Sequence, residues 1–241
     1  MLTLVRRSRR SMGLRLLLDS ADLSVWRQWW PTGLFRGITT NPTLLRRAGQ
    51  SCSLEGLAQL SEQALALGAE ELHLQAWGTG PQELEQRGRA LAALAPGRIL
   101  VKLPITETGV RAARPLREAD IPITFTACYE PAQVLVAAAL GARYIAPYLG
   151  RIGDQGRDGH ATLAAMQRAL DGMGSPTRLL VASLRSPEDL PRLAAVGCDT
   201  FTLGPAIAAA LFTSSATEAA ARQFEQDAAA PLASAQPQPL P

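Results

Sequence analysis

The sequence has almost no lysine. Of its 24 basic residues, 23 are arginines and one is Lys102. Arginine stays protonated at any working pH, whereas a buried lysine can lose its proton and attack a carbonyl group. A need for positive charge alone therefore does not explain the lysine at position 102. Two explanations remain: a chemical role for the amine of Lys102, or chance survival of an ordinary surface lysine. The position of Lys102 in the predicted fold distinguishes between them.

Cysteine and histidine are also scarce. Three cysteines without a Cys-x-x-Cys pair favour a reducing compartment, so we expect a cytoplasmic protein. Two histidines that stand far apart, His73 and His160, argue against a zinc site or any other metal centre built on histidines. No apolar run approaches the roughly 18 residues of a membrane span, and the N-terminus lacks the apolar segment of a signal peptide. We therefore expect no membrane association.

Strand-like and helix-like segments alternate eight times between residues 14 and 227. The strands are continuous apolar runs, which is typical of a parallel sheet covered on both faces, and a closed barrel is the natural solution for a chain of 241 residues. An open doubly wound sheet is the alternative, but the first strand is followed by Asp19-Ser20-Ala21-Asp22 and not by a glycine-rich phosphate fingerprint. The sequence therefore predicts the α/β class and a single (β/α)8 TIM barrel. The predicted strands are residues 14–19, 37–40, 71–77, 99–103, 121–126, 143–147, 178–183 and 200–203, and the last helix is 216–227.

Polar side chains stand at the ends of seven consecutive predicted strands. They are Asp19; Thr39, Thr40 and Asn41; Gln75; Lys102; Thr126; Tyr148 and Arg151; and Ser183 and Arg185. Each residue alone has a purely structural explanation: Asp19 could cap a helix, and Asn41 could belong to an Asn-Pro turn. In a barrel, however, the carboxyl ends of the strands meet at one opening, where active sites lie. The pattern therefore predicts a functional site at that opening.

Lys102 interrupts the apolar run Ile99–Leu103. Burial of an ammonium group is costly, so the pKa of Lys102 should fall, and arginines at the same opening would lower it further. The free amine could then attack a ketone, and the resulting iminium would withdraw electrons so that the adjacent carbon–carbon bond breaks. Asp19 and Asn41 are placed to hold and protonate the intermediates.

Three residues beyond the sixth and seventh strands suggest a phosphate site. Arg151, Ser183 and Arg185 together offer positive charge and hydrogen-bond donors. The stretch 150–159 has glycines at positions 150, 153, 156 and 159, which suits close approach of backbone to an anion. Such a stretch is more often simply a flexible loop, and we expect a loop here.

The motifs together resemble the transaldolase family, specifically its small single-domain members, which include fructose-6-phosphate aldolase. They are LLLD at 16–19, GITTNPTLL at 37–45, VKLPIT at 101–106, TFTACY at 124–129, ARYIAPYLGRI at 142–152, VASLRS at 181–186 and FEQD at 224–227. The resemblance covers about residues 14–227. It implies a Schiff-base lysine at Lys102, acid/base and orienting roles for Asp19 and Asn41 with Thr39 and Thr40 nearby, a phosphate site at Arg151, Ser183 and Arg185, and neither a metal nor an organic cofactor.

Two reactions compete within this family. Transaldolases pass a dihydroxyacetone unit between sugar phosphates of the pentose phosphate pathway, from sedoheptulose 7-phosphate to glyceraldehyde 3-phosphate, whereas fructose-6-phosphate aldolases release it. The resemblance implies Glu and Phe on strands three and six of transaldolases, where this chain has Gln75 and Tyr148, with Thr126 completing a water site. We therefore expect aldolase-type release, while Gly150 looks more like the transaldolase pattern and keeps transfer as the alternative. A catalytically idle barrel is a more remote alternative, and a deoxyribose-phosphate type of aldolase would need a second lysine.

The remaining expectations concern the ends of the chain and its partners. We expect residues 1–13 to form a disordered basic extension, with Met12 as a second candidate start, residues 14–227 to form the barrel domain, and residues 228–241 to form a disordered tail. The basic run at 6–10 is not continued by a basic helix, so we expect no nucleic-acid binding. The expected partners are sugar-phosphate substrates and, by the resemblance, copies of this chain in a pentamer or decamer, with the helix around Phe224 reaching a neighbour.

Overall fold

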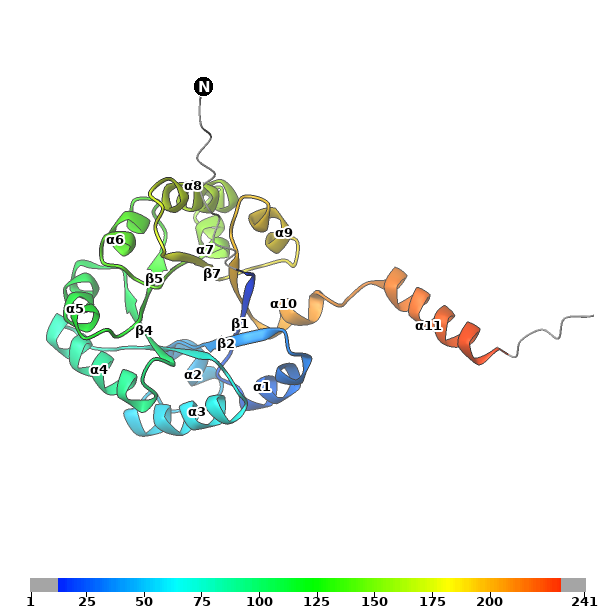
Figure 1. The fold of residues 1–241 in the computed structure, drawn as a ribbon, viewed down its shortest axis with the longest axis horizontal. Helices are drawn as coiled ribbons and strands as arrows, with labels where there is room; N and C mark the ends of the chain where they lie inside the picture. Colours follow the sequence, from blue (N-terminus) through cyan, green and yellow to red (C-terminus); the bar gives the residue numbers. More distant parts are fainter. Residues whose placement is uncertain (1–12, 231–241) are drawn as a thin grey trace, which may run out of the picture.

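The computed structural model describes residues 13–230, and these residues confirm the predicted barrel. Eight parallel strands close in the order β1 to β8, with helices around the outside (Figure 1). The strands are β1 (Arg15–Asp19), β2 (Phe35–Thr39), β3 (Glu71–Gln75), β4 (Ile99–Pro104), β5 (Ile123–Cys128), β6 (Tyr144–Pro147), β7 (Arg178–Val181) and β8 (Thr200–Leu203).

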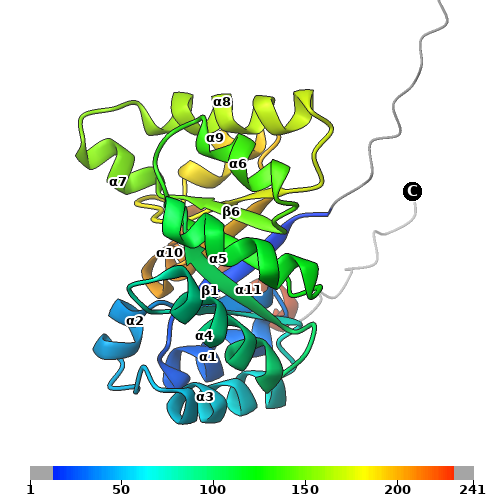
Figure 2. The ribbon, with the colours of Figure 1, turned by 90° about the vertical axis from the view of Figure 1, so that its left-hand side faces the viewer.

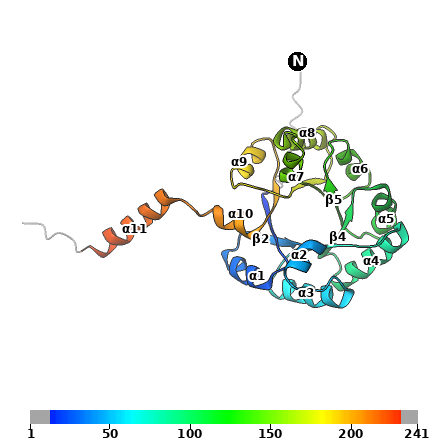
Figure 3. The same cartoon turned by 180° about the vertical axis from the view of Figure 1, so that it is seen from behind.

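Three of the strands, β2, β6 and β8, are each followed by two α-helices. The helices are α1 (Leu23–Trp29), the 3-10 turn η1 (Trp30–Thr32), α2 (Pro42–Arg47), α3 (Leu54–Ala66), α4 (Pro81–Leu94), α5 (Glu107–Glu118), α6 (Gln133–Ala139), α7 (Leu149–Asp154), α8 (Gly159–Gly172), α9 (Asp189–Ala194), α10 (Pro205–Ala210) and α11 (Ser215–Ala229). The short helices α2 and α7 come directly after β2 and β6 and lie beside the barrel opening (Figure 3). None of the helices within residues 13–230 combines the length and apolarity needed to cross a membrane.

Capping side chains set where several helices begin. Ser53, Thr106 and Asp158 each accept a hydrogen bond from a backbone N–H of the helix that follows, which satisfies a donor that the first turn leaves free. Asp22, and not Asp19, caps α1 by accepting from the backbone nitrogen of Ser24 at 2.8 Å. The carboxylate of Asp19 is therefore not used in a cap.

The interior of the barrel is closed below the opening. Leu17, Leu100, Leu180 and Ala146 form a buried apolar layer with Tyr144. Beneath it, the hydroxyl of Tyr144 donates to the carboxylate of Glu71 at 2.9 Å. A ligand can therefore reach the barrel interior only from the end where the strands finish, as the packed cores of such barrels require.

Larger apolar side chains fill the space between the strands and the outer helices, for example Trp26, Phe125 and Phe201. Helices α4 and α5 pack next to each other on this outer wall, and both contact β4 (Figure 2). Strand β4 is thus covered on its outer face by helices and on its inner face by the barrel core. A lysine on this strand is held in an apolar wall.

Two local expectations were wrong. The stretch 150–159 is not one loop, because α7 occupies Leu149–Asp154 and only Gly156 of the four glycines has a positive φ. The last helix ends at Ala229 and not at Asp227, so the tail expected from residue 228 begins in helical structure. The expected disorder of residues 1–12 and 231–241 lies outside the described residues.

Helix α11 extends away from the barrel (Figure 1). None of its residues is buried, and Phe224 is 70% exposed. Its hydrogen bonds are local, such as the cap that Ser214 provides to Thr217. The helix therefore contributes an outlying arm and no part of the barrel core.

Candidate active site

A cavity of about 170 Å³ lies at the carboxyl ends of the strands. Seven of the predicted residues line it: Asp19, Thr39, Asn41, Lys102, Tyr148, Arg151 and Ser183. The other four, Thr40, Gln75, Thr126 and Arg185, do not line the cavity but contact its walls or the loops around it. The volume is below the usual range of drug-sized ligand pockets, which is about 300–1,000 Å³, and suits a small ligand.

Lys102 is 5% exposed and projects from β4 into this cavity. Its Nζ donates a hydrogen bond to the backbone oxygen of Thr40 at 2.6 Å. Burial lowers the pKa of Lys102, and the charge of Asp19 opposes that effect only in part. The geometry therefore favours an amine that can shed its proton, which is what a nucleophile needs.

Asp19 lies opposite, at the end of β1. One of its carboxyl oxygens accepts a hydrogen bond from the hydroxyl of Thr39 at 2.6 Å, and that hydroxyl also lies 2.6 Å from the hydroxyl of Thr202. Burial raises the pKa of Asp19, although Lys102, Thr39 and Arg151 each act to lower it. The low-polarity site thus shifts the acid and the amine toward their neutral forms, a pairing suited to proton transfer.

A second polar pair stands across β5 and β6. The hydroxyls of Thr126 and Tyr148 lie 2.6 Å apart, so the structure brings together two members of the expected water site. The third member, Gln75, turns away from them. Its amide donates to the backbone oxygens of Lys102 at 3.2 Å and Ala76 at 3.3 Å, which ties the ends of β3 and β4 together.

Asn41 caps a helix and also lines the cavity. Its side-chain oxygen accepts a hydrogen bond from the backbone nitrogen of Leu44 at 3.0 Å and so caps α2, which is the structural explanation open to an Asn-Pro sequence. Asn41 also lines the cavity. Because the cap occupies only the oxygen, the amide N–H₂ group remains available as a donor to a ligand.

Arg151 sits on α7 with its guanidinium 4.7 Å from the centre of the Tyr148 ring. A hydrogen bond from its side chain to Tyr129 raises the pKa of Arg151, which keeps it a cation. The short helix after β6, which we expected to be a loop, is what carries this charge to the cavity. Arg151 and Ser183 therefore form the part of the predicted phosphate site that the structure brings together.

Arg185 lies outside the cavity. Its guanidinium pairs with Asp154 at 2.6 Å, and both side chains are 62% exposed. The side chain also crosses Gly150 so closely that a Cβ there would lie 2.3 Å from the Arg185 Nε. The same Cβ would lie 2.6 Å from the backbone oxygen of Ser183, which cannot swing aside as an exposed side chain can, so the close approach requires glycine at position 150.

The loop that carries Ser183 is strained and tightly held. Ser183 has a φ of +60°, which is uncommon for a residue other than glycine. Its backbone oxygen accepts from Gly150 at 2.8 Å. Asp189 holds the next turn, because one carboxylate oxygen accepts from the backbone nitrogens of Arg185 and Ser186, each at 3.0 Å, while the other lies 3.0 Å from His160 Nε2.

Sequence reasoning missed three polar residues of the cavity wall. Thr202 comes from β8, the one strand to which we assigned no polar side chain. Thr43 and Arg47 come from α2, where their spacing of four residues puts them on one face of the helix. The inward alternation of TFTL and the position of α2 directly after Asn41 were the signals that could have found them.

Neither His73 nor His160 lines the cavity. His73 is fully buried with its Nδ1 3.0 Å from the Thr124 hydroxyl, and burial holds its pKa well below the usual range. Within residues 13–230, no group of three or more His, Cys, Asp or Glu side chains is arranged to hold a metal ion.

The family model and the similar curated proteins point to the same class of enzyme. The family model described as transaldolase/fructose-6-phosphate aldolase matches residues 16–237. A probable transaldolase of Caulobacter sp. (strain K31) is 34% identical over 214 residues, covering 89% of this chain and 96% of the relative. A probable transaldolase of Desulfitobacterium hafniense (strain DSM 10664 / DCB-2) is 34% identical over 216 residues, covering 89% and 98%.

Among solved structures, thiamine phosphate pyrophosphorylase from Pyrococcus furiosus superposes with a TM-score of 0.56 at 11% identity, covering 79% of this chain and 85% of that one, which supports the barrel fold alone. The fold, the family match and the relatives together define an enzyme of the transaldolase/aldolase class. The chain belongs to the transaldolase/fructose-6-phosphate aldolase family.

Proposed function

We propose that this enzyme cleaves fructose 6-phosphate through a Schiff base on Lys102 and releases dihydroxyacetone. The observation that carries the proposal is the buried amine of Lys102 in the cavity beside Asp19. The amine adds to the ketone carbon, and loss of the carbonyl oxygen as water leaves an iminium. The iminium then accepts the electron pair of the C3–C4 bond as glyceraldehyde 3-phosphate departs.

Asp19 is the proposed acid and base of these steps. In its protonated form it can supply the proton that the departing water takes up, and the carboxylate left behind can receive the proton of the C4 hydroxyl as the bond breaks. Thr39 fixes the carboxyl group through the 2.6 Å hydrogen bond. The amide N–H₂ of Asn41 is the proposed donor to a substrate hydroxyl, and the Thr40 carbonyl orients the Lys102 amine.

The fate of the enamine distinguishes the two reactions of the family. Release requires the enamine to take up a proton and the iminium to be hydrolysed, whereas transfer requires the enamine to wait for an acceptor aldehyde. The Thr126–Tyr148 pair supports release, because two hydroxyls at 2.6 Å can hold a water and the Tyr148 hydroxyl can donate a proton. Transfer is the second candidate, favoured by relatives that are named probable transaldolases.

The proposed phosphate site consists of Arg151 and Ser183 at the cavity, with Arg185 close by. Arg151 provides a permanent charge and Ser183 a hydroxyl. Arg185 would contribute only by exchanging its exposed pair with Asp154 for the phosphate, which is inexpensive because exposed ion pairs contribute about 0–1 kcal/mol.

The single lysine makes a direct test possible. Reduction with borohydride in the presence of dihydroxyacetone should add the three-carbon unit to the peptide that contains Lys102 and to no other side chain, and the Lys102→Met variant should remain unlabelled. An idle barrel would leave Lys102 unmodified. Incubation with fructose 6-phosphate alone, followed by addition of erythrose 4-phosphate, separates the reactions, since cleavage that needs the acceptor would contradict release.

We also propose that the enzyme is a homo-oligomer, a pentamer or decamer, in which α11 packs on a neighbouring copy. The exposed Phe224 and the absence of buried residues in α11 support a partner for this helix. The mass of the particle in solution, compared with that of a chain truncated after Phe212, tests it. A monomer in both cases would contradict the proposal.

A further inference from the structure

A second cavity, of about 520 Å³, lies outside the strands, beside the loop that follows the carboxyl end of β3. It is lined by Leu54 of α3, by Trp77 and Gly78 of the loop after β3, and by Glu83, Gln86, Arg87 and Ala90 of α4. It shares no lining residue with the Lys102 cavity. Its volume falls within the usual range of small-molecule sites.

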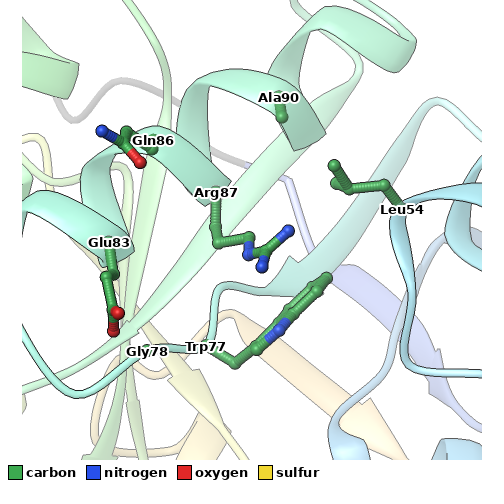
Figure 4. A pocket seen from close by; sticks show the side chains of 7 residues that line it. All are labelled: Leu54, Trp77, Gly78, Glu83, Gln86, Arg87 and Ala90. Carbon is green, nitrogen blue, oxygen red and sulfur yellow. The ribbon is translucent and has the colours of Figure 1, made fainter.

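Arg87 in this cavity does not make the ion pair that its position predicts. Glu83 stands four residues before it, a spacing that forms ion pairs elsewhere in the chain: Glu85–Arg89, Glu107–Arg111 and Arg114–Glu118. Here one oxygen of Glu83 instead accepts from the backbone nitrogen of Thr79 at 2.7 Å and from its hydroxyl at 3.2 Å. Arg87 lies over the Trp77 ring, 4.8 Å from its centre, so that its donors are left facing the cavity (Figure 4).

The loop that carries Trp77 is fixed against α4. Gly78 has a φ of +152°, and a Cβ there would lie 2.7 Å from the Cβ of Glu83. Only glycine allows this approach, and the bonds from Thr79 to Glu83 complete the attachment. The loop is therefore held against α4 before a ligand arrives, which reduces the entropy lost on binding.

The charges of the cavity balance. Hydrogen bonds from Thr79 lower the pKa of Glu83, so it is a carboxylate, and Arg87 is a cation. A free anion would meet the Arg87 charge together with the opposing charge of Glu83. Neighbouring hydroxyls of one molecule instead suit both groups, since a hydroxyl accepts from a guanidinium and donates to a carboxylate. Gln86 offers both a hydrogen-bond donor and an acceptor. Leu54 and Ala90 offer apolar surface for the C–H groups of such a molecule.

We infer that this cavity binds the polyhydroxylated carbon chain of a sugar, at a site separate from the Lys102 cavity. The inference goes beyond the proposed reaction and does not depend on it. The cavity borders the loop directly after Gln75, whose amide binds the Lys102 backbone, so an occupied cavity would lie against the same β3–β4 edge as the catalytic amine.

Indole ¹⁵N–¹H spectra of the Lys102→Met variant test the inference, because this variant cannot form a Schiff base with the sugar. The chain has four tryptophans, and Trp77→Phe assigns the Trp77 signal. Titration with fructose should shift the Trp77 signal in a saturable way, and Arg87→Ala should weaken this binding at least about tenfold, as expected for loss of a bidentate charged donor.

Arg89→Ala is the matched control, because Arg89 is on the same helix but is paired with Glu85. It should leave the fructose affinity unchanged, and the other three indole signals report whether each variant is folded. Arg87→Lys, which keeps the charge but loses the fork of donors, should also bind fructose more weakly. The inference is wrong if fructose leaves the Trp77 signal in place, if inorganic phosphate shifts it and fructose does not, or if Arg89→Ala weakens binding as much as Arg87→Ala.

Discussion

Replacing Asp189 by alanine should damage the handling of phosphorylated substrates far more than the chemistry. Asp189 is 7% exposed, and its carboxylate holds the backbone nitrogens of Arg185 and Ser186 and the ring of His160, each at 3.0 Å. Because Ser183 keeps a left-handed φ of +60° at a cost of roughly 1–3 kcal/mol, its loop needs such attachments to stay in place. Without them we expect the loop to relax and Ser183 to leave the cavity wall.

The size of the effect follows from the bonds lost. Hydrogen bonds to a charged group contribute about 1.5–3 kcal/mol each, and the relaxed loop recovers part of that through water. If about 1.4–2.7 kcal/mol of the loss falls on the positioning of the phosphate group, KM for a phosphorylated acceptor rises about 10- to 100-fold. The assay is addition of dihydroxyacetone to glyceraldehyde 3-phosphate and, separately, to glyceraldehyde, with kcat and KM measured for each.

The expected pattern is a raised KM for glyceraldehyde 3-phosphate, little change for glyceraldehyde, and a kcat within a few-fold of the parent for both. Asp154→Ala is the control, since it removes only the exposed partner of Arg185 and should change KM by less than about fivefold. Equal losses with both aldehydes, or an unchanged KM for the phosphorylated one, would refute the role assigned to the Asp189 loop.

Tyr148→Phe should raise the ratio of transfer to release. The ratio is measured from the fructose 6-phosphate consumed with and without erythrose 4-phosphate. An unchanged ratio would mean that the Tyr148 hydroxyl takes no part in release. The proposed reaction uses Lys102 as the free amine, so the rate of borohydride trapping should fall as pH decreases. Because the Asp19 charge raises the pKa of Lys102, Asp19→Asn should move that fall to lower pH, and a shift to higher pH would contradict the proposal. Gly37→Ala should lower the free energy of unfolding by about 1–3 kcal/mol or more, because its Cβ would lie 2.3 Å from a backbone oxygen of β3. Gly153→Ala has open space around it and should stabilise α7 by up to about 1 kcal/mol. Thermal unfolding should therefore give a lower Tm for Gly37→Ala than for Gly153→Ala.

The barrel could be predicted because strand-like and helix-like segments alternate along the sequence. Most of its polar opening could be predicted because polar residues stand where the strands end. Asp19 and Thr39 end their strands, and Lys102 is the one charged side chain of a buried strand, so the polar end of a barrel is the place that suits all three. The resemblance added roles to these positions, but their convergence is a consequence of parallel strands that end at one face.

What could not be predicted depends on side-chain direction and on short helices. A strand position does not say that the Gln75 amide binds the backbone oxygen of Lys102, which also accepts from the backbone nitrogen of Ala76, because the rotamer of Gln75 decides this. The pairing of Arg185 with Asp154 depends on α7, and four glycines in ten residues gave no sign of a helix there. The Asp189–His160 contact joins side chains 29 residues apart, and no local pattern indicates it.

The single buried lysine also determines how this protein meets amine-reactive chemistry. Reducing sugars damage most proteins by condensing with exposed lysines, and protonated arginine side chains react with these sugars far less readily. Apart from the α-amino group, Lys102 is the one primary amine in the chain, and it is 5% exposed. Under the proposed Schiff-base reaction, glycation or acylation of the one side-chain amine and loss of activity are therefore the same event.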